Sequence, residues 1–471
     1  MVMGRWEVER QRELFVAADR AAKAPRHVFY EKLNSLLREA AFDRWVEGLC
    51  EEFYSERGRG SIPPGRYFRM LFIGYFEGID SQRGIAWRCE DSLSLKVFLG
   101  LEPFDESPDH SSLTKIGDRL PTEVYREVFQ FVLRMVQERG LLKGQTVGVD
   151  STLLEANAAM KSIVRKDNGD DWEEYLKTLA AAEGRELKSK AELIRFDKDR
   201  NKQDGGKKVS NDDWQSPSDP DARIAKMKDG TTHLAYKAEH AVDLDTEVIL
   251  AAEVYHGDQA DSATIEDTLS LAGGQVVEVT HGTSQIEEAV ADKGYHKAET
   301  LARLTDHRGS HRHTEHSASA TNLNLRTYIA EPDVKHQRRW IDKPPEWEAA
   351  YRGNRRRIQG SRGKSLQRRR SEVVERSFAH VCETGGARRT CLRGLTKIMK
   401  RYQLQTAAHN LGLILRQLLG AAKPRAFAAF CLLTQALVSH LHASLRTWSV
   451  LSHLWDTNCR QQLRRPATLA T

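Results

Sequence analysis

Between residues 144 and 419, short runs rich in β-branched residues alternate with amphipathic segments of helical period, and this alternation restricts the fold. In chain order it predicts a strand, a polar insertion, two paired strands, a helix, a strand, a helix, a strand and then further helices. The predicted strands cover residues 145–150, 233–242, 247–254, a run that ends before Asp292, and 327–329. The main helices are predicted over residues 262–272 and 371–419. A mixed α/β sheet with helices on its faces accounts for this order.

The first part of the chain, residues 1–138, has the apolar spacing of helices throughout. Pro63 and Pro64 are suited to open one helix. Residues 107–113 have the pattern of a turn and an N-cap before another. This arrangement suits a compact helical DNA-binding module, although any small helical bundle gives the same pattern.

The length of 471 residues corresponds to two or three domains, at about 100–200 residues per domain. We expect a helical N-terminal DNA-binding domain at 1–138 and an α/β domain at 139–420. The second contains a strongly polar insertion at about 160–222. Residues 421–471 form a predicted C-terminal helical tail of unknown role.

Positive charge is concentrated in one segment. The net charge of the whole chain is only +6, but residues 335–370 contain 13 Lys and Arg against three acidic residues, a local excess of 10. Such asymmetry favours a polyanionic partner, most simply nucleic acid. A solvated loop is the alternative explanation.

The cysteines and the hydropathy pattern indicate the compartment. None of the six cysteines forms a C-x-x-C pair or a zinc-binding spacing, which is typical of reduced thiols in a cytosolic protein. The first residues are soon strongly charged, unlike a signal peptide. The most apolar stretch, residues 426–445, is interrupted by polar side chains, so a membrane span is not expected.

Three acidic residues stand at positions suited to chemistry. Asp150 and Asp292 each follow a run that has the pattern of a strand, and Glu375 lies in a helical pattern. Three carboxylates brought together from these elements would make the oxygen-rich site that Mg²⁺ prefers. Each has a structural alternative: Asp150 as a helix N-cap, Asp292 as a turn residue, and Glu375 as a solvated helix residue with Glu372 as its rival.

Four short motifs follow one another in the chain, at residues 147–152 (VGVDST), 218–223 (SDPDAR), 291–295 (ADKGY) and 374–378 (VERSF). Together they resemble the DDE transposases of bacterial insertion sequences. The block from about residue 29 to 120 also resembles the helical domain that precedes the catalytic core in this family. The resemblance covers roughly residues 25–420.

The resemblance implies an RNase H-like core in which Asp150, Asp292 and Glu375 are catalytic and hold two Mg²⁺ or Mn²⁺ ions, with Asp150 shared between them. The implied reaction hydrolyses phosphodiester bonds at the ends of a mobile element and joins the freed 3′-OH to target DNA. It also implies double-stranded DNA as partner, at least a dimer, and a bacterial cytoplasmic, nucleoid-associated location.

The chain departs from the family around the glutamate. Many relatives carry a Tyr and an Arg before it and a Lys seven residues after it, where this chain has Arg368, Ser371 and Cys382. The basic role in gripping DNA is therefore assigned to nearby arginines, each with plain solvation as its alternative. These are Arg368, Arg369, Arg370, Arg388 and Arg389. Arg-to-phosphate contacts add affinity without reading sequence.

Two other functional classes remain open at this point. One is a transposase-derived protein that binds DNA but has lost catalysis, and the intact acidic triad argues against it. The other is a metal-dependent nuclease that cuts DNA without joining strands.

Overall fold

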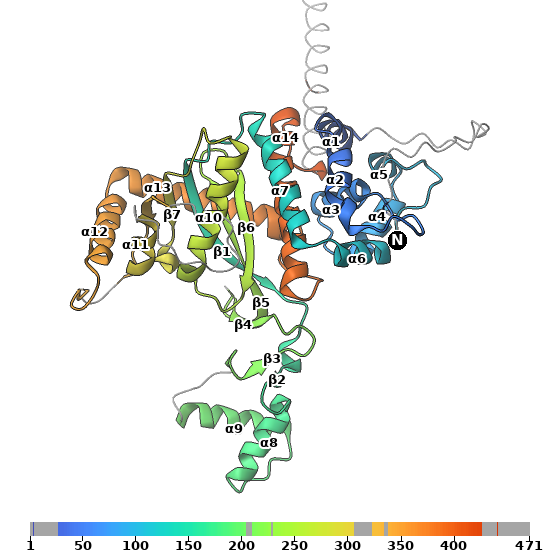
Figure 1. Cartoon of the computed structure of the whole chain (residues 1–471). Coiled ribbons are helices and arrows are strands. Elements are labelled where there is room, and N and C mark those ends of the chain that lie inside the picture. Colours follow the sequence, from blue (N-terminus) through green and yellow to red (C-terminus); the bar gives the residue numbers. More distant parts are fainter. Residues whose placement is uncertain are drawn as a thin grey trace, which may run out of the picture.

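The computed structural model describes residues 27–203, 210–227, 229–305, 323–333 and 338–425, together with Met3 and His440. Figure 1 shows a body with a central sheet between helices, a block of helices on one side, and an arm that projects from the body. Most of the predicted tail at 421–471, and most of the apolar stretch at 426–445, lie outside the described residues. Within the described part, no helix is both long and apolar enough to cross a membrane.

The N-terminal part is helical, as predicted. Its helices are α1 (Val28–Glu39), α2 (Phe42–Cys50), α3 (Pro64–Glu77), α4 (Gln82–Glu90), α5 (Leu93–Phe98), α6 (His110–Arg119) and α7 (Thr122–Gln137). Local sequence sets several of their starts. Pro64 occupies the first turn of α3, and the Asp109 side chain caps α6 by accepting the Ser111 amide at 2.8 Å.

The sheet is mixed and has the order β4-β5-β1-β7-β8, with β6 also paired to β5. Its strands are β1 (Thr146–Glu155), β4 (Arg223–Lys226), β5 (Thr232–Asp243), β6 (Ile249–His256), β7 (Glu288–Ala291) and β8 (Arg326–Ile329). β1 runs antiparallel to β5 and parallel to β7, and β5 and β6 form the predicted hairpin. The short strand β4 was not predicted from the sequence.

The first strand is longer than predicted. The sequence suggested a strand that ends at Asp150, whereas β1 continues to Glu155 because β5 pairs with it along this whole length. On the other side β7 stops at Ala291, opposite Val149. Asp150 therefore lies inside a strand, at the point where the sheet opens on its β7 side.

Helices cover both faces of the sheet, and strand alternation decides which residues meet which helix. α10 (Asp261–Val279) covers the face that carries Ser151 and Glu239, whose side chains lead to its first turns. α13 (Ser361–Phe378) covers the face that carries Gly148 and His240. Beside β8, α11 (Ala298–Thr305) packs on α12 (Pro345–Gln359), a helix that was not predicted.

The long helix predicted over 371–419 is two helices. α13 ends at Phe378 and continues as a wide turn over Ala379–Glu383, and α14 spans Leu395–Leu419. The connection contains Gly386 and Gly394, whose φ angles of 83° and 86° fall in the region that favours glycine. These glycines break the helical pattern that the flanking sequence suggests.

α14 lies between the sheet and the N-terminal helices α1–α7, which we call the helical block (Figure 1). It contacts α7 and α3 on one side and β6 on the other, and most of its side chains are buried, including Leu411 and Ile414. Apolar residues of the helical block and of the sheet consequently form one continuous core. The division into domains near residue 138 stays a prediction; α7 ends at Gln137.

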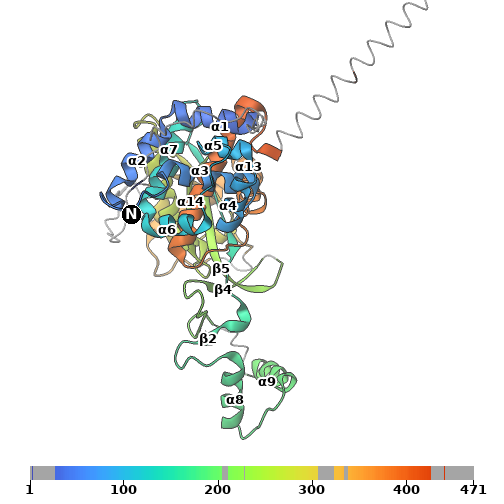
Figure 2. The same cartoon turned by 90° about the vertical axis from the view of Figure 1, so that its right-hand side faces the viewer.

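The polar insertion forms the arm that projects from the body in Figures 1 and 2. It contains β2 (Val164–Arg165), α8 (Trp172–Ala182), α9 (Lys190–Gln203) and β3 (Trp214–Gln215). Asp171 and Glu174 form a capping box at the start of α8. The arm has a small core of its own, made by Leu176, Ala180, Leu193 and Phe196.

Candidate active site

Asp150 and Asp292 lie on neighbouring parallel strands. The register pairs Val149 of β1 with Ala291 of β7, so the residues that follow them, Asp150 and Asp292, stand side by side where β7 ends. The two aspartates of the predicted triad are thus brought together from positions 142 residues apart in the sequence.

Asp150 is held by a charged and a neutral donor. One carboxylate oxygen accepts the Ser151 amide at 2.8 Å, and the other forms an ion pair with the Arg370 guanidinium at 2.7 Å. The Arg370 residue is only 8% exposed. This ion pair therefore balances the charge of Asp150 in a largely dry environment, where Coulomb interactions are strong.

Asp292 makes the turn that leads out of β7. Its Oδ1 accepts the Gly294 amide at 2.8 Å and caps a short 3-10 turn over Lys293–Tyr295. The alternative interpretation of Asp292 as a turn residue is therefore correct for one of its oxygens. That structural bond leaves a partly exposed carboxylate next to Asp150.

Glu375 is exposed on α13, and its Oε1 accepts the Ser371 hydroxyl at 3.0 Å. Gln367, Ser371 and Glu375 follow one another at i, i+4 and i+8 and so share one flank of the helix. Gln367 is the first residue of this row. Its side-chain amide donates a hydrogen bond to the Ala291 carbonyl, at the end of β7, at 3.0 Å. The row that carries Glu375 therefore starts at the strand end that carries Asp292.

Glu372, the rival acidic residue, has a different environment. It forms an ion pair with Arg376, which also binds Glu247 in the connection between β5 and β6. Arg376 thus ties the flank of α13 that carries it to this connection. Glu375 as the third acidic residue stays a prediction.

Within the described residues, no group of three or more His, Cys, Asp or Glu side chains already surrounds one point in the manner of a metal site. The predicted donors still suit Mg²⁺ or Mn²⁺ chemically, because all are carboxylates, and two of them stand side by side. A cation bound by Asp150 would compete with Arg370 for the same oxygen.

Sequence reasoning missed a polar cluster on the α10 side of β1. Asp261, the first residue of α10, accepts the Ser151 hydroxyl at 2.8 Å and faces the Lys237 ammonium at 3.3 Å. Glu239 is fully buried and accepts hydrogen bonds from the Tyr295 hydroxyl and two threonines of α10. Burial raises the pKa of Glu239 to about 7. The available signal was an acidic residue, Asp261, directly before the helix predicted over residues 262–272.

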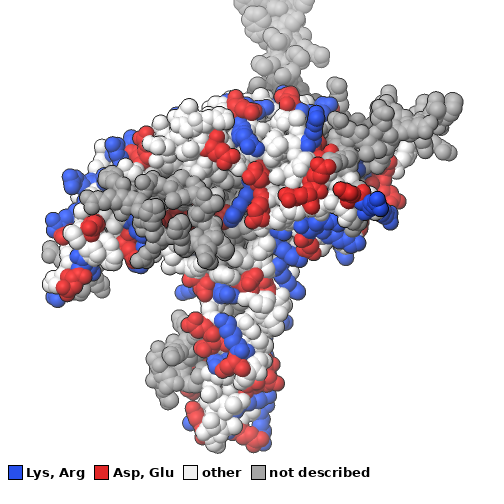
Figure 3. All heavy atoms as spheres, in the orientation of Figure 1, with Lys and Arg blue, Asp and Glu red and all other residues white. Residues whose placement is uncertain are grey.

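The five predicted DNA-binding arginines differ in exposure and partners. Arg368 is exposed and has no ion-pair partner among the described residues, whereas Arg370 binds Asp150. Arg369 donates to the Leu244 carbonyl, Arg388 pairs with Glu383, and Arg389 lies 3.6 Å from Glu155. Figure 3 shows positive and negative side chains interspersed over the face it displays. DNA contact by the five arginines stays a prediction.

The motif at residues 218–223 anchors α14. Asp219 is fully buried, and its Oδ1 accepts the Tyr236 hydroxyl at 2.6 Å and the Gly394 amide at 3.0 Å. Asp221 accepts the Leu395 amide at 3.0 Å. Two aspartates therefore bind the amides of the N-cap residue Gly394 and of Leu395, the first residue of α14, where negative charge is favourable.

Asp219→Ala is expected to destabilise the protein by about 3 kcal/mol, because it leaves the buried Tyr236 hydroxyl and the half-buried Gly394 amide without their charged acceptor. Asp221→Ala, which removes one amide contact at the helix start, should cost about 1 kcal/mol. Urea unfolding followed by circular dichroism measures both values. Equal losses for the two variants would contradict the anchoring role of Asp219.

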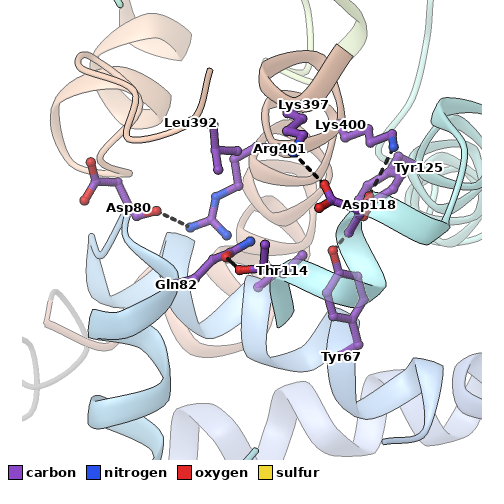
Figure 4. Close-up of a pocket in the computed structure, with 12 residues that line it drawn as sticks. Tyr67, Asp80, Gln82, Thr114, Asp118, Tyr125, Leu392, Lys397, Lys400 and Arg401 are labelled. Atoms are coloured by element: carbon purple, nitrogen blue, oxygen red, sulfur yellow. Dashed lines mark hydrogen bonds and ion pairs between the residues drawn. The ribbon is translucent and has the colours of Figure 1, made fainter. Parts of the chain in front are cut away.

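Figure 4 shows a pocket between α14 and the helical block, with a volume of about 60 Å³. Its cations have protein partners. Lys397 pairs with Asp118 at 2.7 Å, and Lys400 donates to the Gly117 carbonyl. Arg401 donates to the Ile79 carbonyl at 3.0 Å. We interpret this pocket as part of the joint that fixes α14 to the helical block.

Two protein families match the chain. Residues 18–119 match the transposase domain (DUF772), and residues 330–415 match the transposase DDE domain. The first match covers most of the helical block, and the second begins just after β8 and covers α12, α13 and most of α14. No curated protein matches the chain, and no solved structure matches it.

The matched DDE domain implies an RNase H-like core, and the mixed sheet with helices on both faces agrees with it. A transposase domain in the N-terminal helices and a DDE domain around the helix of Glu375 occur here in one chain. Together the two matches support a DDE transposase of an insertion sequence.

Proposed function

We propose that the protein binds the ends of its own mobile element, cuts them and joins them to target DNA. The observation that carries this proposal is the placement of Asp150 and Asp292 side by side where β7 ends. The flank of α13 that includes Glu375 begins at the same strand end, through Gln367.

Asp150, Asp292 and Glu375 would hold Mg²⁺ or Mn²⁺, two ions in all. When bound, such ions act as Lewis acids on the phosphate and lower the pKa of the attacking oxygen. Until then Arg370 balances the charge of Asp150, while the Ser151 and Gly294 amides and the Ser371 hydroxyl orient the three carboxylates.

The proposed reaction has two displacements at phosphorus. In the first, water attacks a phosphodiester at the element end, the bond from phosphorus to the 3′ oxygen breaks, and a 3′-OH and a 5′-phosphate result. In the second, that 3′-OH attacks a phosphodiester of target DNA and displaces its 3′ oxygen. Since both steps activate an oxygen nucleophile against the same kind of phosphate, one acidic site can serve both.

We assign DNA contact to the helical block and to the arginines around α13, with exposed Arg368 as the first candidate. The paired ends of an element call for at least two copies of the chain. A protein acting on chromosomal DNA would work at the nucleoid.

Cleavage of a DNA fragment that carries the gene's own flanks tests the proposal. We expect Mg²⁺-dependent cuts at the flanks by the wild type, no cuts in EDTA, and none by Asp292→Asn. Joined products with a target plasmid would separate a transposase from a nuclease. Binding without cutting by the wild type, on paired ends, would favour a catalytically silent protein, and cuts that survive Asp292→Asn would rule out the assigned triad.

A further inference from the structure

A fourth carboxylate, Asp261, touches the surroundings of both Asp150 and Asp292. Its Oδ1 accepts the Ser151 hydroxyl at 2.8 Å. Its Oδ2 lies against Gly294, so closely that a Cβ atom added to this glycine would be only 2.7 Å from it. Asp261 therefore packs between β1 and the turn that follows β7.

The two residues that Asp261 touches are the ones whose amides hold the catalytic aspartates. Ser151 donates its amide to Asp150, and Gly294 donates its amide to Asp292, each at 2.8 Å. One oxygen of Asp261 thus contacts the residue that orients one aspartate, and the other oxygen contacts the residue that orients the second. Asp261 therefore bridges the two residues that donate these amides.

The charge of Asp261 is compensated from the protein side. Lys237 is 4% exposed and directs its ammonium to Asp261 at 3.3 Å and to the Thr264 hydroxyl at 2.8 Å. Asp261 is also the first residue of α10, where the helix dipole favours an anion. A buried lysine needs such partners to stay charged, so Lys237 and Asp261 hold one another in place.

We propose that Asp261 is a positioning residue of the active site, which fixes the relative placement of Asp150 and Asp292 through Ser151 and Gly294. This inference rests on the proposed function, because it concerns the same acidic site. Loss of a group that orients metal ligands commonly weakens metal binding by about 10–100-fold. Asp261 therefore controls metal affinity without itself binding the metal.

Mn²⁺ titration of the full-length protein without DNA, followed by the electron paramagnetic resonance signal of free Mn²⁺, tests this role. Asp261→Asn should weaken binding about tenfold or more, and Ser151→Ala should weaken it in the same direction while changing no charge. Glu278→Gln removes a charge from the far end of the same helix and should leave binding unchanged. Thermal unfolding in EDTA checks that each variant is folded.

Asp150→Asn, measured in parallel, separates the two hypotheses. If Asp150→Asn leaves Mn²⁺ binding intact, the proposed acidic site is wrong and the role of Asp261 fails with it. If Asp150→Asn abolishes binding while Asp261→Asn and Ser151→Ala bind like the wild type, the proposed function survives and the inference about Asp261 is overturned.

The contact with Gly294 gives a second test that depends on packing. Gly294→Ala places a methyl group against the Asp261 carboxylate and should weaken Mn²⁺ binding. In an Asp261→Ala background the methyl group meets only the Asp292 Oδ1, at 3.1 Å, and no longer the closer Asp261 carboxylate. The effect of Gly294→Ala should therefore be at least about fivefold smaller there, as expected for directly coupled residues. Equal effects of Gly294→Ala in the two backgrounds would overturn the proposed contact.

Discussion

Glu375→Gln is expected to lower the rate of flank cleavage by about 1,000-fold. The amide keeps the shape of the side chain and its bond from Ser371 but loses the negative charge that a divalent cation requires. Metal-assisted stabilisation of the reacting phosphate contributes several kcal/mol, and each 1.36 kcal/mol corresponds to a tenfold change in rate. Single-turnover cleavage of a labelled flank in Mg²⁺ measures the effect.

Glu372→Gln is the matched control, since it makes the same change one turn earlier on the same helix. Glu372 pairs with Arg376 at the protein surface, and exposed ion pairs contribute about 0–1 kcal/mol. Cleavage by this variant should stay near the wild-type rate. A large loss with Glu372→Gln and none with Glu375→Gln would exchange the roles of the two residues.

Arg69→Met is expected to destabilise the protein by about 3–5 kcal/mol, the cost of removing one partner of a buried ion pair. Arg69 is fully buried in α3 and donates to both carboxylate oxygens of Asp43, at 2.9 and 2.8 Å. It also donates to Asn34 and to the Phe98 carbonyl, so three other segments lose a donor. Urea unfolding gives the free energy directly.

Arg352→Met serves as the comparison for Arg69→Met. Arg352 pairs with Glu348 on the exposed side of α12, where its side chain is 70% exposed. Its loss should change stability by less than about 0.5 kcal/mol. Similar losses of unfolding free energy for the two variants would mean that the buried Arg69–Asp43 ion pair between α3 and α2 does not stabilise the protein as expected.

The sequence predicts those parts of the fold that depend on local patterns. The α6 cap at Asp109 and the β5–β6 hairpin follow from turn chemistry and periodicity within a few residues. The extent of β1 does not, because its end depends on β5, a strand about 80 residues away in the chain. The break between α13 and α14 was not predicted. Gly386 and Gly394 interrupt the helix because their φ angles are positive, and the sequence does not give these angles.

The candidate site also contains residues that local motifs predict and residues whose role depends on contacts between distant segments. Asp150, Asp292 and Glu375 could be selected because each lies in a recognisable motif. Arg370 could not be distinguished from Arg368 and Arg369, since only the rotational position of α13 over β1 directs one of the three to Asp150. Asp261 was missed because its importance comes from contacts with Ser151 and Gly294, which lie far from it in sequence.

The burial of α14 between the helical block and the sheet has a mechanical consequence. With α7 and α3 packed on one side and β6 on the other, α14 joins the helical block and the sheet into one packed unit. If the helical block binds a DNA end as proposed, the distance between the bound sequence and the acidic residues is then fixed by the protein. The cut would therefore fall at a constant distance from the recognised sequence.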